Sequence, residues 1–229
     1  MAMSIAHLAD FENLQPDDCI IHSAPMSHGS GLYILPYIAR ACAHIVPASR
    51  GFDAAEFLDL CAAHGNCGAF MAPTMLRRLR VEAERRGERA RGLRSIVYGG
   101  GPMYLDEIQR ALRCFGSVFR QLYGQGEAPM TITGLRAEDF AIDSEAVLAS
   151  VGWPRSGVAV KIVDEAGAEL PIGAIGEIVC QGDVVMAGYW RNAAATASTI
   201  RDGWLYTGDM GLLSAEGMLT LQGRSKEVI

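Results

Sequence analysis

The first 124 residues alternate short apolar runs of strand-forming residues with segments of helical pattern. The expected strands are residues 18–25, 44–48, 67–73, 93–100 and 117–124. The expected helices lie in residues 31–43, 54–65 and 105–116 and in an arginine-rich stretch that follows residue 73. Asp53 is the expected N-cap of the helix at 54–65. This alternation is typical of a mostly parallel sheet covered by helices. Ligands of such sheets bind beyond the carboxyl ends of the strands, so the loops there are the first candidate binding segments: "APMSHGSG", "APT", "YGGGPM" and "YGQGE".

After about residue 140 the pattern changes to closely spaced strands. They are expected at residues 158–167, 176–183, 204–213 and 217–224, with one short helical stretch at 192–200. The turn sequences "DEAG" and "SAEG" favour hairpins, so we expect an antiparallel sheet or partial barrel. The predicted fold is α/β: a mostly parallel sheet flanked by helices, then a smaller antiparallel β subdomain. The predicted subdomains are residues 1–140 and 141–229.

The composition and charge of the chain exclude several classes of function. The 229 residues are 50% hydrophobic and carry a net charge of −6, so no overall positive field attracts nucleic acid or an anionic membrane. The six cysteines are far apart and lack C-x-x-C spacing, which indicates free thiols in a reducing compartment. No apolar run is long enough to span a membrane, and the first residues lack the features of a signal peptide. The expected location is the cytoplasm.

One basic stretch departs from the acidic average. Between Arg77 and Arg94 the sequence has eight arginines and three glutamates in a helix-forming context. The simplest interpretation is a solvated helix face with charge pairs four residues apart. The alternative function is a non-catalytic module that uses this helix to bind nucleic acid or a protein partner. Because the chain as a whole is acidic, we do not expect nucleic acid as a partner.

Six motifs occur in a fixed order: "PMSHGSG", "YGGGPM", "YGQGE", "GEIVCQG" followed by "GYW", "GWLYTGD" and "GRSKE". Together they resemble the adenylate-forming acyl- and aryl-CoA synthetases, a superfamily that includes luciferases and peptide-synthetase adenylation domains. The resemblance covers nearly the whole chain. These enzymes join a carboxylate to ATP, giving an acyl-adenylate and pyrophosphate, and then transfer the acyl group to coenzyme A. The resemblance therefore implies ATP or AMP, Mg²⁺ and coenzyme A as cofactors, and a small carboxylic acid as substrate.

The resemblance implies roles for four side chains. Tyr123 matches the aromatic residue that lies against adenine, where a flat ring provides contact area. Glu127 matches the catalytic carboxylate linked to magnesium, an ion that prefers oxygen ligands. Asp209 matches the aspartate that accepts both ribose hydroxyls, for which a carboxylate offers two acceptor atoms. Arg224 matches the arginine that reaches the ribose or the phosphate.

Further positions follow from the same motifs. His28 matches a histidine beside the acyl carboxylate, so it is the second catalytic candidate. Lys226 falls at the family hinge, and Trp190 and Trp204 are expected to be packing anchors. The other nucleotide-binding residues that the resemblance implies lie in two glycine-rich loops: Gly100, Gly101, Pro102, Gly124, Gln125 and Gly126.

The chain also departs from the family pattern. The family usually has threonine where this chain has Gly126, so we expect weaker nucleotide binding. The upstream phosphate loop and the C-terminal domain with its lysine are not in the sequence. We therefore expect an inactive fragment of a protein roughly twice as long. The alternative within the family is an adenylation domain that loads a carrier protein. The identity of the carboxylic acid and the oligomeric state stay open.

Overall fold

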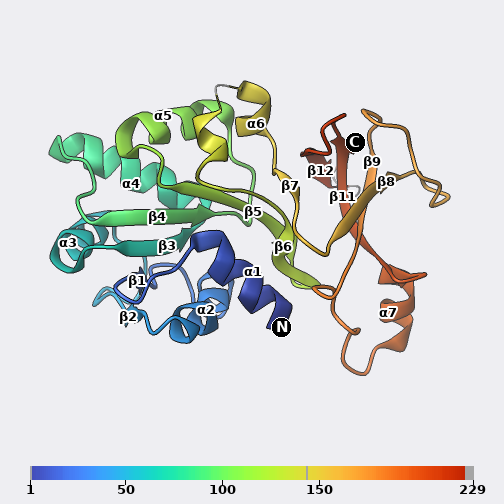
Figure 1. Cartoon of the computed structure of the whole chain (residues 1–229), viewed down its shortest axis with the longest axis horizontal. Helices are drawn as coiled ribbons and strands as arrows, with labels where there is room; N and C mark the ends of the chain where they lie inside the picture. The colour runs from blue at the N-terminus through green and yellow to red at the C-terminus, as the bar shows by residue number, and fades with distance from the viewer. Residues whose placement is uncertain (1, 143, 225–229) are drawn as a thin grey trace. The chain divides into compact units, whose positions relative to one another are not determined.

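The structure is a computed structural model that describes residues 2–142 and 144–224. The chain divides into two compact units. Unit 1 contains Met1–Leu122 and Leu135–Leu148, and unit 2 contains Tyr123–Gly134 and Ala149–Ile229. Figure 1 shows the elements of both units with their labels. The boundary between residues 140 and 141 stays a prediction.

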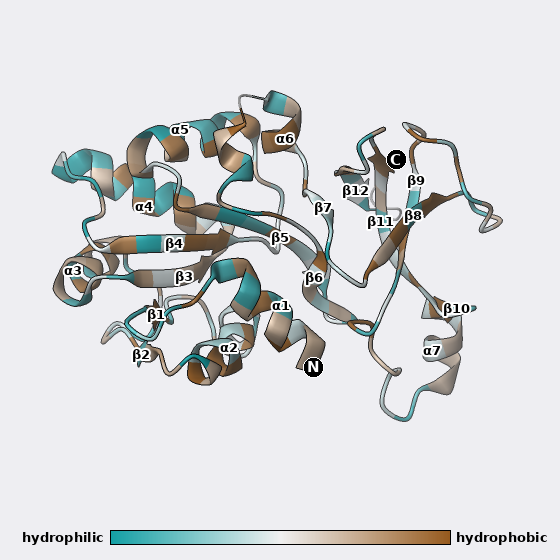
Figure 2. Cartoon of the chain, viewed as in Figure 1, coloured by the Kyte–Doolittle hydropathy of each residue, from teal (hydrophilic) through white to brown (hydrophobic). Residues whose placement is uncertain are grey.

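Unit 1 is built around a parallel sheet. Its strands run in the order β2-β1-β3-β4-β5, and each neighbouring pair is parallel. The strand β3 is buried along its whole length and β4 over its last four residues, as expected where helices cover a parallel sheet, and Figure 2 shows brown, hydrophobic stretches along them. The strands are β1 (Cys19–Ile21), β2 (Ala43–Ile45), β3 (Cys67–Met71), β4 (Leu93–Tyr98) and β5 (Phe119–Gln125).

Helices alternate with these strands. Helix α4 contacts both α3 and α5, and α1 contacts α2. The predicted N-cap of α3 is confirmed, because the Asp53 carboxylate accepts a hydrogen bond from the Glu56 amide at 2.8 Å. The helical elements assigned to this part are α1 (Ala2–Glu12), η1 (Gly29–Tyr33), α2 (Ile34–Ala39), α3 (Ala54–His64), α4 (Pro73–Arg86), α5 (Leu105–Phe115), η2 (Asp139–Ala141) and α6 (Glu145–Ala149).

Unit 2 contains an antiparallel sheet of order β10-β11-β9-β8, with β12 paired to β11. The strand β6 follows β5 in the first sheet and pairs antiparallel with β7. The predicted fold class is therefore confirmed: a mostly parallel sheet with helices and a smaller antiparallel sheet. The remaining elements are β6 (Ala128–Leu135), β7 (Trp153–Pro154), β8 (Ala159–Val163), β9 (Gly176–Gln181), α7 (Ala193–Thr199), β10 (Ile200–Arg201), β11 (Trp204–Leu213) and β12 (Leu219–Arg224).

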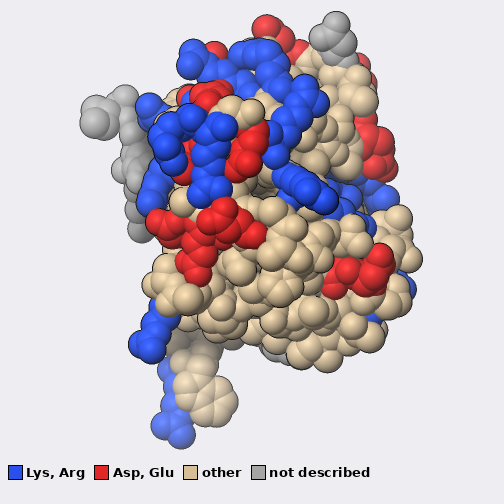
Figure 3. All heavy atoms as spheres, turned by 90° about the vertical axis from the view of Figure 1, so that its left-hand side faces the viewer, with Lys and Arg blue, Asp and Glu red and all other residues tan. Residues whose placement is uncertain are grey.

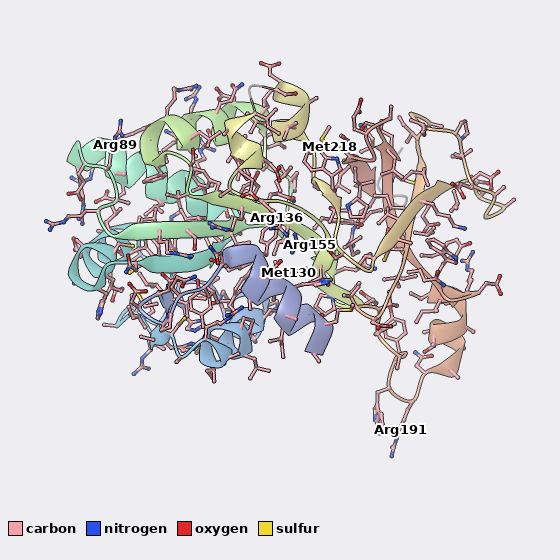
Figure 4. The ribbon with its side chains drawn as sticks, in the orientation of Figure 1. Arg89, Met130, Arg136, Arg155, Arg191 and Met218 are labelled. Carbon is pink, nitrogen blue, oxygen red and sulfur yellow. The ribbon has the colours of Figure 1, made fainter. Side chains whose placement is uncertain are left out.

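The arginine-rich stretch forms most of α4, the loop after it and the start of β4. Arg85 and Arg86 both pair with Glu82, at 2.7 and 3.0 Å. Arg80 pairs with Glu84 at 2.8 Å. Figure 3 shows acidic side chains interspersed among the basic ones on this side of unit 1, and in Figure 4 Arg89 lies at its outer edge. The pairs with Glu82 and Glu84 agree with the expected charge pairs within the helix. The face is not solvated throughout, because Arg80 is only 5% exposed and also pairs with Glu107 of α5, and Arg86 pairs with Asp59 of α3.

Two further expectations concern the cysteines and membrane-spanning helices. All six cysteines are free. Cys19 and Cys67 are register partners on β1 and β3, and their sulfur atoms are 3.2 Å apart. In the part of the chain that the structure describes, no helix combines the length and the apolar character needed to cross a bilayer.

Candidate functional site

The turn between β5 and β6 holds two of the predicted residues at fixed positions. The β5 strand ends at Gln125 and β6 begins at Ala128, so only Gly126 and Glu127 connect them. The strands approach closely at Gly124, where a Cβ atom would lie 2.6 Å from the Ala128 carbonyl oxygen and would overlap the Met130 backbone. Only glycine fits this contact without a shift of the backbone. Tyr123 therefore lies just before the close contact between β5 and β6 at Gly124, and Glu127 lies in the turn just after it.

A bend in β11 positions Asp209, the predicted ribose-binding residue. The register with β9 shifts between Tyr206 and Met210, and Gly208 has a φ of 72°, a conformation that favours glycine. The Thr207 hydroxyl donates to the Ile178 carbonyl at 2.7 Å and accepts from the Asp209 amide at 3.1 Å. Asp209 is held in a fixed backbone position with only 9% of its surface exposed.

Three of the predicted residues meet at the Asp209 carboxylate. The Tyr123 hydroxyl donates to Oδ2 at 2.8 Å, and Arg224 Nε donates to Oδ1 at 3.1 Å. Burial raises the pKa of Tyr123, and the Asp209 charge adds to this effect, so the phenol stays a hydrogen-bond donor at neutral pH. A carboxylate has about four acceptor positions. Two donors therefore leave acceptor capacity on Asp209 for hydroxyl groups of a ligand.

A groove of about 540 Å³ within unit 2 is lined by Gly208 and Arg224, the chain neighbour and the ion-pair partner of Asp209, whereas Asp209 itself is not among its lining residues. The β5–β6 turn, the bend in β11, the end of α7 and Arg224 all contribute to its lining. It also contains two carboxylates, Glu127 and Glu177, and a second arginine, Arg201. Arg201 lies over the ring of Tyr206, 4.2 Å from its centroid. The groove thus offers both anionic and cationic groups to a polar ligand.

Its acidic side chains fit the magnesium ion that the resemblance implies. Mg²⁺ is usually held by one or two carboxylates together with phosphate oxygens and water. Glu127 and Glu177 supply carboxylate oxygens of this kind along one groove. Among the described residues there is no group of three or more metal-ligating side chains. The donor set fits an ion shared with a phosphate ligand, which would be held mainly by Glu127.

The other predicted site residues lie in unit 1. His28 is exposed, directly precedes η1, and its Nδ1 is 2.9 Å from the Ser27 hydroxyl. Gly100, Gly101 and Pro102 follow the carboxyl end of β4, and Gly100 has a φ of 75°. Lys226 lies outside the described residues. The roles of all these residues stay predictions.

Some residues of the groove were not identified from the sequence. Tyr189 lies in the "GYW" motif, and its hydroxyl donates a hydrogen bond to Glu127 Oε1. The expectation that Trp190 is a packing anchor is wrong for the described chain, because 86% of this residue is exposed. It lies in an exposed turn before α7, where the neighbouring Arg191 points away from the strands of the unit (Figure 4). Trp204 instead packs under Lys161, whose Nζ is 4.1 Å from the ring centroid.

Comparison with known proteins establishes the class. Residues 1–190 match the family described as AMP-binding enzyme, and the chain belongs to this family. The medium/long-chain-fatty-acid–CoA ligase FadD8 of Mycobacterium tuberculosis is 32% identical over 90% of this chain and 35% of its own length. The fatty acid–[acyl-carrier-protein] ligase ScoC of Streptomyces coeruleorubidus is 30% identical over 96% of this chain and 42% of its own length.

The solved structures agree with these sequence matches. The crystal structure of ATP-bound MatB from Rhodopseudomonas palustris has a TM-score of 0.85 and 30% identity, and it matches 100% of this chain and 44% of that one. The predicted resemblance to the adenylate-forming ligases is therefore confirmed. The chain spans between about a third and a half of the length of these relatives.

Proposed function

We propose that the protein is an ATP-dependent acyl-CoA ligase. It would join a small carboxylic acid to ATP, release pyrophosphate, and transfer the acyl group from the adenylate to coenzyme A. Membership of the AMP-binding family supports the first step. The single observation that carries the proposal is the Asp209 carboxylate, held between Tyr123 and Arg224 beside a groove that contains Glu127.

The chain's own residues would bind the nucleotide as follows. Asp209 would accept hydrogen bonds from the ribose hydroxyls, and Arg224 would keep its charge neutralised. Tyr123 would fix the aspartate through its hydroxyl and offer its ring edge or face to adenine, although only 7% of the residue is exposed. Glu127 would hold Mg²⁺, which when bound neutralises charge on the phosphate oxygens. In unit 1, His28 would lie at the acyl carboxylate, and the segment Gly100–Pro102 would form the wall between the adenine and acyl pockets.

We also propose that the 229-residue chain binds the nucleotide but does not complete the reaction alone. Adenylation requires cations around the transferring phosphoryl group. The sequence has only two lysines, and Lys161 is engaged with the Trp204 ring.

A carrier protein in place of coenzyme A is the alternative acceptor, since ScoC is a ligase of that kind. The cytoplasm stays the expected compartment, and the six free thiols support it.

The test of nucleotide binding is calorimetric titration of this chain with AMP and with Mg·ATP. We expect Asp209→Asn to weaken AMP binding about 30-fold, because the amide loses a charge-assisted acceptor worth about 2 kcal/mol. Asp202→Asn is the matched control, since Asp202 is exposed in the same unit, and its φ of 50° suits asparagine as well as aspartate. Equal AMP affinity of Asp209→Asn and wild type, with both folded, would remove the basis of the proposal.

A second test concerns Gly126. A Cβ atom at this position has no neighbour within 4 Å, and the residue has no positive φ, so threonine fits without strain. We expect Gly126→Thr to bind ATP about fivefold more tightly, because its hydroxyl adds one hydrogen bond worth about 1 kcal/mol. Gly126→Val has the same shape without the hydroxyl and serves as the control. If both variants bind ATP equally well, the missing hydroxyl does not weaken the site.

A further inference from the structure

Tyr189 contacts the carboxylate that we assign to magnesium, and no motif role accounts for this contact. The residue lies between β9 and α7, with 36% of its surface exposed at the groove. Its hydroxyl donates to Glu127 Oε1. Among the described residues, none donates a hydrogen bond to the other oxygen, Oε2. One oxygen of Glu127 is therefore held, while the other is available to a ligand.

The backbone of Tyr189 is fixed to the start of α7. Its amide donates to the Thr196 hydroxyl at 2.9 Å, and the same hydroxyl donates to the Asn192 carbonyl at 2.9 Å. Asn192 is the N-cap of α7, where its side chain accepts from the Ala195 amide at 3.1 Å. These bonds anchor Tyr189 to a helix end rather than to a free loop.

The segment that leads to Tyr189 lies close to α7. A Cβ atom at Gly188 would lie 2.8 Å from Thr196 Cγ2, and the φ of 148° at this glycine is one that other residues rarely adopt. Earlier in the same segment, the Met186 amide donates to the Glu127 carbonyl at 2.7 Å. Glu127 is thus held by its backbone through Met186 and by its side chain through Tyr189.

We propose that Tyr189 is a positioning residue, which holds the Glu127 carboxylate in the orientation that a magnesium–nucleotide complex requires. The inference rests on the proposed function. A glutamate on a two-residue turn has several side-chain rotamers, and ordering them costs free energy when the ligand binds. A hydrogen bond that is already present removes part of this cost.

The test separates metal-dependent from metal-independent binding. Wild type and Tyr189→Phe are titrated with AMP in the absence of metal, and with ATP over a series of Mg²⁺ concentrations. We expect AMP affinity to change by less than about twofold, and Mg·ATP affinity to fall about tenfold through loss of a hydrogen bond to a charged group. The Mg²⁺ concentration that gives half of the gain in ATP affinity should rise. Tyr104→Phe, at a residue 73% exposed in unit 1, is the control for loss of a hydroxyl.

Each outcome decides the proposal. Unchanged Mg²⁺ dependence in Tyr189→Phe overturns it, and so does an equal loss of AMP and Mg·ATP affinity, which would mean that Tyr189 only shapes the groove. Thr196→Val, which removes the anchor of the Tyr189 backbone and keeps the side-chain shape, should show the same selective loss to a smaller degree. A folded wild type that binds neither nucleotide would overturn the proposed function, and this inference with it.

Discussion

We expect Arg94→Ala to lower the free energy of unfolding by about 3 kcal/mol, the usual cost of removing one partner from a buried ion pair. Arg94 Nε is 3.0 Å from Asp18 Oδ1, and only 3% of the Asp18 side chain is exposed. Arg94 Nη2 also donates to the carbonyl oxygens of Glu12 and Asn13, at 2.9 and 2.7 Å. Alanine would leave these acceptors in unit 1 without their cation.

The loss should depend on pH because of Glu12, of which 1% is exposed. Burial raises its pKa, against the opposing effects of Arg120, the Ser95 hydroxyl and Arg94. A carboxyl group with a raised pKa binds its proton more tightly in the folded state, so its contribution to stability is lost as pH rises above the unfolded value. Removal of Arg94 raises this pKa further. Arg94→Ala should therefore lose more stability at pH 8 than at pH 5.

Urea denaturation at the two pH values measures this loss. Arg91→Ala is the control, because Arg91 is exposed and forms no ion pair among the described residues. We expect it to change stability by less than about 0.5 kcal/mol. Glu12→Gln removes the buried charge, so Arg94→Ala should cost less in that background than in the wild type. Equal stabilities of Arg94→Ala and Arg91→Ala would show that the buried carboxylates do not need Arg94.

Much of the fold follows from local sequence patterns, but strand pairing does not. The alternation of apolar runs and helical segments gave the parallel strands of unit 1 and the cap at Asp53. The segment Ala128–Leu135 was not predicted as a strand, although its apolar and β-branched residues suit one. One neighbour in the sheet, β5, precedes it across a two-residue turn, but the other, β7, lies further along the chain, and a local pattern does not reveal that pairing. The expected strand 18–25 is shorter in the structure, Cys19–Ile21.

For the candidate site, the sequence indicated residue types but not their contacts. The resemblance pointed to Tyr123 and Asp209, which are 86 positions apart. That the tyrosine donates directly to the aspartate depends on how the β5–β6 hairpin meets the bend in β11, which is a tertiary contact. Tyr189 was missed for the same reason, because nothing near it in the sequence indicates a partner at Glu127. Trp190 was misjudged because its motif position says nothing about burial.

The largest expected effect on nucleotide binding comes from a substitution in the hairpin that β5 and β6 form. We expect Gly124→Ala to weaken both AMP and Mg·ATP by more than about 100-fold, equivalent to about 3 kcal/mol. The added Cβ would overlap the Met130 backbone and lie 2.6 Å from the Ala128 carbonyl oxygen, so β5 and β6 must separate. This movement would take Tyr123 away from Asp209, and Glu127 away from Tyr189.

Titration calorimetry measures the loss of binding, and amide hydrogen exchange shows where the structure changes. Protection should fall in residues 123–134 and persist in β1, β3 and β4, because the overlap involves only the backbone of unit 2. Gly51→Ala in unit 1 is the control for a methyl group added to a glycine, since its Cβ meets no atom within 4 Å and its φ is not positive. Wild-type nucleotide affinity in Gly124→Ala would show that the close crossing of the two strands is not what holds the site together. Loss of protection throughout unit 1 would show that the damage is not local.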